Sequence, residues 1–177
     1  MSVIASIWDF AKDFTVEFRI PRRRLVRVYG SSMTPALKDR QWVCVNTAAY
    51  AWARPDRFDV AWFDDPSRPG ERAVKRVIGR PGETVRIDGL LLIVDGVTVP
   101  QPFVRKPLDS GDHYWQLGEG EYVLLGDNRA YSTDSRAYGP VRLENIRGSI
   151  TLCRVESWRN EGGGRNIALE YPAYFGW

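Results

Sequence analysis

Three polar clusters interrupt the apolar pattern of this 177-residue chain, and each holds side chains that can move a proton or attack a carbonyl. The first is Gly30-Ser31-Ser32-Met33-Thr34-Pro35-Ala36-Leu37, in which an apolar segment runs into a glycine and two serines. A bend of this kind can present a serine hydroxyl and its own backbone N–H to a groove. An ordinary surface turn has the same composition, so the cluster alone leaves both interpretations open.

Lys75 is the distinctive residue of the second cluster, Lys75-Arg76-Val77-Ile78-Gly79-Arg80-Pro81-Gly82-Glu83. Only four of the 25 basic residues are lysines, so a lysine within an apolar segment is an unusual choice for this chain. A desolvated ammonium loses its proton readily, and a neutral amine can accept the proton of a serine hydroxyl, whereas a guanidinium cannot. The alternative is a lysine at a strand edge whose ammonium reaches water.

The third cluster follows an apolar segment and is dense in side chains that bond to their own backbone. It reads Gly126-Asp127-Asn128-Arg129-Ala130-Tyr131-Ser132-Thr133-Asp134-Ser135-Arg136. Asp134 and Arg136 can pair and stiffen the loop, and the Ser132 hydroxyl can orient an amine. A surface loop without chemistry also explains this composition.

The sequence offers few residues for other kinds of catalysis. The single histidine, His113, ends the polar segment Asp109-Ser110-Gly111-Asp112, which predicts a surface loop rather than a catalytic base. Cys44 and Cys153 lie in apolar segments and are predicted to be small buried hydrophobes rather than reactive thiols or a disulfide. With one His and two Cys, we expect no metal site and no cofactor. The net charge of +3 comes from interspersed charges without an RNA-type aromatic signature, so no nucleic-acid partner is expected.

The elements that position these clusters are predicted to be mainly β. The chain is 44% hydrophobic and 27% charged, which excludes disorder and fits one domain with a core. Beyond residue 20 the apolar period falls from about 3.6 to about 2 residues, and Asp88-Gly89 and Asp95-Gly96 mark hairpins. We expect coiled antiparallel sheets in a barrel-like arrangement over 21–160, with a hairpin-rich insertion at about 85–117. A Gly-rich turn and aromatic tail follow at 161–177.

The N-terminal segment 1–20 is predicted to be an amphipathic helix. Its apolar side chains recur at helical spacing, and a basic stretch, Pro21-Arg22-Arg23-Arg24, follows them. Such a helix can lie in a membrane interface through residues 3–14, cap the domain, or bind a partner. The longest apolar run, Ala48–Ala53, has six residues, against about 20 in a spanning helix, so no transmembrane helix is expected.

Taken in order, the three clusters resemble the conserved boxes of type I signal peptidases, Ser/Lys serine proteases that remove signal peptides from exported proteins. The resemblance spans about Val26 to Ile150. It implies the signal-peptidase catalytic fold, with Ser32 as nucleophile, Lys75 as general base and Ser132 hydrogen-bonded to the lysine. Residues that support the reaction follow from the same boxes. Gly30 and Ser31 flank the oxyanion site, Gly30 standing where some members carry a hydroxyl, and the loop is braced by Asp127, Asn128, Arg129, Asp134 and Arg136.

The resemblance implies an endopeptidase that cleaves exported preproteins after small residues through an acyl-enzyme. Members of the family normally carry N-terminal membrane-spanning helices, which the apolar pattern of this chain does not predict. We therefore expect interfacial membrane attachment with an extracytoplasmic active site, or alternatively a soluble cytoplasmic protein. Two further alternatives stay open: a catalytically silent peptide-binding module on the same fold, and a Ser/Lys protease that matures one specific soluble substrate.

Overall fold

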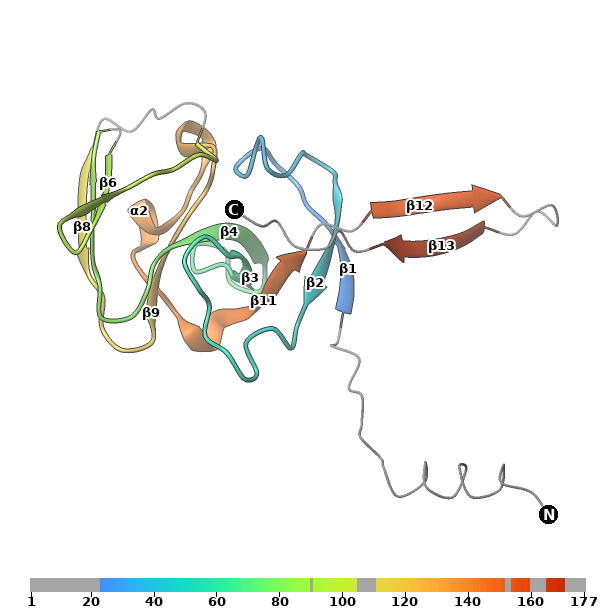
Figure 1. Ribbon diagram of the computed structural model, residues 1–177, viewed down its shortest axis with the longest axis horizontal. Helices are drawn as coiled ribbons and strands as arrows, with labels where there is room; N and C mark the ends of the chain where they lie inside the picture. Colours follow the sequence, from blue (N-terminus) through green and yellow to red (C-terminus); the bar gives the residue numbers. More distant parts are fainter. Residues whose placement is uncertain (1–22, 90, 105–110, 152–153, 160–164, 171–177) are drawn as a thin grey trace, which may run out of the picture.

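The computed structural model describes residues 23–89, 91–104, 111–151, 154–159 and 165–170 (Figure 1). The amphipathic helix predicted at 1–20 lies outside the described residues, as do 161–164 and 171–177 of the predicted C-terminal segment. Within the described part of the chain, no helix has the length and apolar character needed to cross a membrane.

A seven-stranded antiparallel sheet forms the larger part of the molecule, with strand order β1-β2-β11-β3-β4-β9-β10. Its strands are β1 (Arg23–Arg27), β2 (Trp42–Asn46), β3 (Val60–Asp64), β4 (Arg72–Gly79), β9 (Glu121–Leu125), β10 (Val141–Arg142) and β11 (Ile146–Thr151). The sheet curls into a half-barrel. This confirms the predicted mainly β architecture of coiled antiparallel sheets.

A four-stranded sheet, in the order β7-β6-β5-β8, lies at one end of the molecule (Figure 1). It contains β5 (Thr84–Asp88), β6 (Leu91–Val94), β7 (Val97–Val99) and β8 (Asp112–Gln116). The two Asp-Gly pairs lie in its turns, between β5 and β6 and between β6 and β7. At the other end, β12 (Arg154–Arg159) and β13 (Arg165–Glu170) pair as a separate antiparallel hairpin.

Short helices occupy the connections near β9. They are η1 (Arg129–Tyr131), α2 (Ser135–Tyr138) and η2 (Leu143–Asn145). The side chain of Asp134 accepts from the backbone N–H of Arg136 and so caps α2 at its start.

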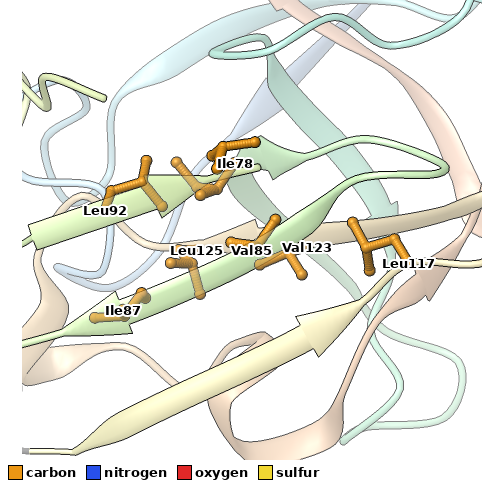
Figure 2. Packing of buried hydrophobic residues seen from close by; sticks show 8 residues of the cluster. Ile78, Val85, Ile87, Leu92, Leu117, Val123 and Leu125 are labelled. Atoms are coloured by element: carbon orange, nitrogen blue, oxygen red, sulfur yellow. The ribbon is translucent and has the colours of Figure 1, made fainter. Parts of the chain in front are cut away.

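The core between the two sheets determines how they join. Ile78, Val85, Ile87, Leu92, Leu117, Val123 and Leu125 pack there, together with Val94 (Figure 2). β4 passes from one sheet toward the other at Gly79, where its pairing with β9 shifts register. A Cβ at Gly79 would lie 2.6 Å from the Val85 side chain and 2.7 Å from that of Leu117, so glycine permits this close approach.

Strand β9 is buried on both faces. Val123 and Leu125 face the core between the sheets, whereas Tyr122 and Leu124 join a second cluster with Phe63 inside the half-barrel. This explains why the segment reads as a continuous apolar run rather than as an alternating one. The polar loop that follows β9 therefore begins at a well-packed strand.

The prediction for Cys44 is wrong in one respect. Cys44 is buried in β2, as expected of a small hydrophobe, but it is disulfide-bonded rather than a free thiol. The register pairs Cys44 with Thr151, so β11 ends directly beside it. This adjacency is non-local, and the apolar neighbours of Cys44 in the sequence do not reveal it. Cys153 lies outside the described residues.

Candidate active site

The turn between β1 and β2 carries Ser32 and is held by apolar side chains that pack into the core. Met33 and Leu37 are buried in a cluster with Val43, and the Leu37 N–H donates to the Met33 carbonyl at 2.8 Å. Burying a side chain of this size stabilises the folded state by about 1.5–3 kcal/mol, so the turn is firmly held. Ser32 itself is half-buried.

Gly30 begins this turn in a conformation that favours glycine, with φ of 91°. Its N–H donates to the Asp39 carboxylate at 2.8 Å. Gly30 therefore contributes backbone geometry, and it offers no side-chain donor to a substrate oxyanion.

Lys75 lies within β4, opposite Ala61 of β3, and is only 6% exposed. Its Nζ donates to Ser32 Oγ at 2.9 Å and to the Val74 carbonyl at 3.2 Å. Burial lowers the pKa of the Lys75 ammonium below its ordinary value, although the nearby Asp134 carboxylate opposes this. The structure thus brings together the two residues to which the resemblance assigns the roles of nucleophile and general base.

The loop after β9, Gly126–Arg136, closes over the Ser32 turn. The Asn128 N–H donates to the Ser32 carbonyl at 2.9 Å, and its side-chain amide donates to the Ser31 carbonyl at 3.1 Å. The same amide donates to Thr34 Oγ1 at 3.1 Å. Asn128 therefore ties the first cluster to the third across the molecule.

Gly126 makes this approach possible. A Cβ added at Gly126 would lie 2.6 Å from the Ser32 carbonyl oxygen and 2.3 Å from Ser132 Oγ. Real Cβ atoms do not come so close to other atoms, so any side chain would push the loop off the Ser32 turn. The sequence analysis did not single out Gly126 for a role of its own.

Ser132 lies beside Gly126 with a buried hydroxyl. Its Oγ makes no hydrogen bond of regular geometry among the described residues, but it lies close enough to the Asp134 carboxylate to help lower the pKa of that group. The hydrogen bond to Lys75 that the resemblance implies is therefore not made among these residues. The site as described links Lys75 to Ser32 directly and leaves the Ser132 hydroxyl close by.

Asp134 and Arg136 form the buried ion pair that the sequence analysis expected. Arg136 donates from Nε to Asp134 Oδ1 at 2.8 Å, and the Gly126 N–H donates to Asp134 Oδ2 at 3.0 Å. Burial raises the pKa of Asp134, but the Arg136 and Gly126 bonds outweigh this and hold the pKa below its ordinary value. Arg136 also donates to the Arg129 carbonyl at 2.7 Å and so closes the loop on itself.

A second buried ion pair joins the loop to β4. Arg76, next to Lys75, donates to both carboxylate oxygens of Asp127, at 2.8 and 2.6 Å. Asp127 is fully buried, and such bidentate pairs are geometrically specific. Arg129 is buried as well, and its Nε donates to the Gly126 carbonyl at 3.0 Å. Arg76 belongs to the second cluster, yet its role depends on a contact 51 residues away.

His113, the single histidine considered as an alternative base, lies in the four-stranded sheet. His113 is half-buried in β8, opposite Ile87, and stacks on Trp115 with ring centroids 5.7 Å apart. The prediction of a surface loop at His113 is therefore wrong, because strand pairing with β5 overrides the polar sequence before it. Among the described residues, no group of three or more His, Cys, Asp or Glu side chains is arranged to hold a metal ion.

Comparisons with known proteins point to one family. Residues 16–155 match the family model described as signal peptidase, peptidase S26. The chain is 34% identical over 139 residues to signal peptidase I V of Bacillus subtilis (strain 168), covering 71% of this chain and 82% of that protein. It is 31% identical over 143 residues to signal peptidase IB of Staphylococcus aureus (strain COL), covering 71% of this chain and 74% of that protein.

A solved structure extends the agreement to the fold. The signal peptidase I of Enterococcus faecalis V583 superimposes with a TM-score of 0.51 and 32% sequence identity, covering 55% of this chain and 97% of that chain. The resemblance carried by the three clusters is confirmed. The chain belongs to the signal peptidase family of S26 serine peptidases.

Proposed function

We propose that the chain cleaves signal peptides from exported preproteins, with Ser32 as the nucleophile and Lys75 as the general base. The observation that carries the proposal is the 2.9 Å contact between Lys75 Nζ and Ser32 Oγ, made by a buried amine. Because burial lowers the pKa of Lys75, more of the amine is neutral near pH 7 than in water. The substrate class follows from the relatives named signal peptidase I.

The reaction proceeds in two halves. Ser32 Oγ attacks the scissile carbonyl carbon while neutral Lys75 takes the hydroxyl proton, and the resulting ammonium then donates that proton to the leaving amine. The C–N bond breaks and an acyl-enzyme ester remains on Ser32. A water molecule then attacks the ester and loses its proton to Lys75, which returns it to Ser32 Oγ as the new carboxyl product leaves.

The oxyanion of each tetrahedral intermediate is placed at the backbone N–H of Ser32. Asn128 supports this assignment because it bonds the carbonyls of Ser31 and Ser32 and so fixes the orientation of the peptide groups around the nucleophile. Gly30 supplies the turn but no hydroxyl. In this proposal the site therefore relies on backbone donors.

An open edge of β4 suggests how a peptide reaches Ser32. Among the described residues, Arg72–Lys75 pair with β3 alone, because β9 pairs with β4 only from Arg76 onward. An extended peptide can add to this edge as a further strand, using backbone hydrogen bonds that tolerate many sequences. Selection of small residues before the cleaved bond is part of the proposal and rests on the family.

The supporting residues take the roles that the family implies. Asp134 and Arg136 hold the Gly126–Arg136 loop, and the Ser132 hydroxyl is available to orient the Lys75 amine. The Ser132 hydroxyl is buried beside the Asp134 carboxylate, and to orient the Lys75 amine it would move toward Lys75 Nζ. Attachment to a membrane surface through residues 3–14, with the active site outside the cytoplasm, completes the proposal.

Cleavage of a peptide that carries a signal-peptide cleavage site tests the assignment. Ser32→Ala and Lys75→Ala should each reduce turnover to background, whereas Ser31→Ala, which keeps the backbone carbonyl bound by Asn128, should retain most of it. Substantial turnover in either of the first two variants would refute the dyad. Peptide binding without turnover in the wild type would instead favour the silent binding module.

A further inference from the structure

A short segment after β7 reaches from the four-stranded sheet to the Gly126–Arg136 loop. Residues Gln101–Val104 form a turn that is closed by a 3.1 Å hydrogen bond from the Val104 N–H to the Gln101 carbonyl. Side chains of this segment contact the two arginines that hold the loop, Arg129 and Arg76. Both contacts join residues far apart in the sequence, and Gln101 and Phe103 themselves lie outside the three polar clusters.

Gln101 contacts Arg129 directly. An Nη atom of Arg129 donates to Gln101 Oε1, while Arg129 Nε donates to the Gly126 carbonyl at 3.0 Å. Arg129 is only 4% exposed, so its guanidinium has little access to water that could replace a lost acceptor. Two hydrogen bonds of Arg129 therefore connect Gln101 to Gly126, the glycine that packs against the Ser32 carbonyl.

Phe103 holds the segment in place from the other side. Its ring lies over the Arg76 guanidinium, with Cζ 4.3 Å from the ring centroid, and meets the Phe58 ring edge-on at 5.1 Å between centroids. Arg76 in turn makes the bidentate pair with Asp127. The segment thus contacts both arginines that bond to the start of the loop.

We propose that Gln101 is a positioning residue for catalysis: through Arg129 it holds Gly126 against the Ser32 turn and thereby sets the rate of turnover. The proposal rests on the Ser32 and Lys75 assignment above. Gln101 and the Gly126 carbonyl are bound by different nitrogens of the same Arg129 guanidinium, so the effect of Gln101 on the reaction is transmitted through Arg129 and the loop. Its loss should change the rate of the chemical step and leave substrate affinity nearly unchanged.

Two substitutions separate hydrogen bonding from packing. Gln101→Met keeps the length of the side chain and removes the acceptor, whereas Gln101→Glu keeps an acceptor for Arg129. Because small displacements of catalytic groups are costly, Gln101→Met should lower kcat about tenfold with KM within about twofold of wild type. Gln101→Glu should restore kcat to within about threefold of wild type. Gln116→Met, at an exposed position of β8, is the matched control and should leave both constants unchanged.

Hydrogen exchange gives a readout that does not depend on activity. The backbone amides of residues 124–131 should exchange faster in Gln101→Met than in wild type, and Gln101→Glu should reverse this.

If wild type cleaves no signal peptide while the exchange pattern holds, the proposed function fails and the structural link stands. If wild type cleaves normally but Gln101→Met matches it in kcat and exchange, the link is wrong. Equal loss of kcat in the Met and Glu variants would also overturn the proposal.

Discussion

Lys75 Nζ and Ser32 Oγ lie 2.9 Å apart although 43 residues separate them in the sequence. Their apolar neighbours explain how this distance is held. Met33 and Val74, each adjacent to one of the two polar residues, are buried in the same cluster. Because a strand directs successive side chains to opposite faces, burial of Val74 on one face fixes where Lys75 emerges on the other. Apolar packing shared by Met33 and Val74 thus helps to position Ser32 and Lys75 relative to each other.

Replacing Lys75 with arginine should abolish activity while keeping the charge. Because burial lowers the pKa of Lys75, wild-type kcat/KM should rise with pH, with a midpoint below the ordinary lysine value of about 10.4. The rise occurs because the neutral amine is the active form, and its fraction increases as pH passes through the lowered pKa. Lys75→Arg cannot deprotonate in this range and should be inactive at every pH. Peptide cleavage between pH 5 and pH 10 measures this, and a pH-independent wild type would contradict it.

Gly126→Ala should inactivate the protein more than it unfolds it. The new methyl group would meet the Ser32 carbonyl oxygen at 2.6 Å, which is backbone and cannot rotate away. Displacement of the loop by an ångström or so should lower kcat by about 100-fold. Gly118→Ala is a suitable control because its Cβ would first meet the flexible Glu121 side chain, at 3.2 Å. Equal activity of the two variants would show that the loop tolerates the displacement.

The clusters and the β architecture were accessible from the sequence because they depend on local signals. Turn residues, alternating apolar residues and a lysine among arginines are each visible within about ten positions. The Gly126 contact and the Arg129 contact to Gln101 are not, since both depend on which strands become neighbours. The Cys44 disulfide was missed for the same reason, because the register that sets β11 beside β2 has no local signature.

At His113, a local sequence signal predicted the wrong structure. The polar residues before it predicted a loop, yet five consecutive residues of β8 pair with β5, and that pairing decides the structure. A short segment with both polar and aromatic side chains fits a half-buried strand equally well, and tertiary pairing overrides its local preference. Strand pairing and close backbone approach are thus the features of this protein that could not be predicted from the sequence.

The predicted amphipathic segment at 3–14 should bind anionic membranes. Its apolar residues and the following arginines suit an interface with acidic headgroups. Wild-type protein should sediment with anionic vesicles at low salt, and the double variant Ile7→Asp with Trp8→Ala should stay in the supernatant. Ser6→Asp adds the same charge to the predicted polar side and should still sediment. Wild-type protein that remains in the supernatant at low salt would exclude this attachment.

Asp134→Asn should reveal how much the buried ion pair stabilises the fold. At pH 7 the substitution leaves Arg136 without its carboxylate, and breaking a buried pair from one side costs about 3–5 kcal/mol. Because the folded state lowers the pKa of Asp134, the pair contributes fully above the ordinary Asp pKa of about 3.9. Its contribution is lost as pH falls below that value toward the lowered pKa.

The pH dependence separates this effect from a general loss of packing. Urea unfolding of wild type and Asp134→Asn should give a difference in unfolding free energy that is large at pH 7. This difference should shrink below about pH 4, because the carboxylate is then protonated first in the unfolded state and, at lower pH, in the folded state as well. Asp112→Asn removes an exposed pair with Arg86 and should change stability little at either pH. A difference between wild type and Asp134→Asn that stays constant down to pH 2 would mean that the carboxylate charge is not what holds the loop.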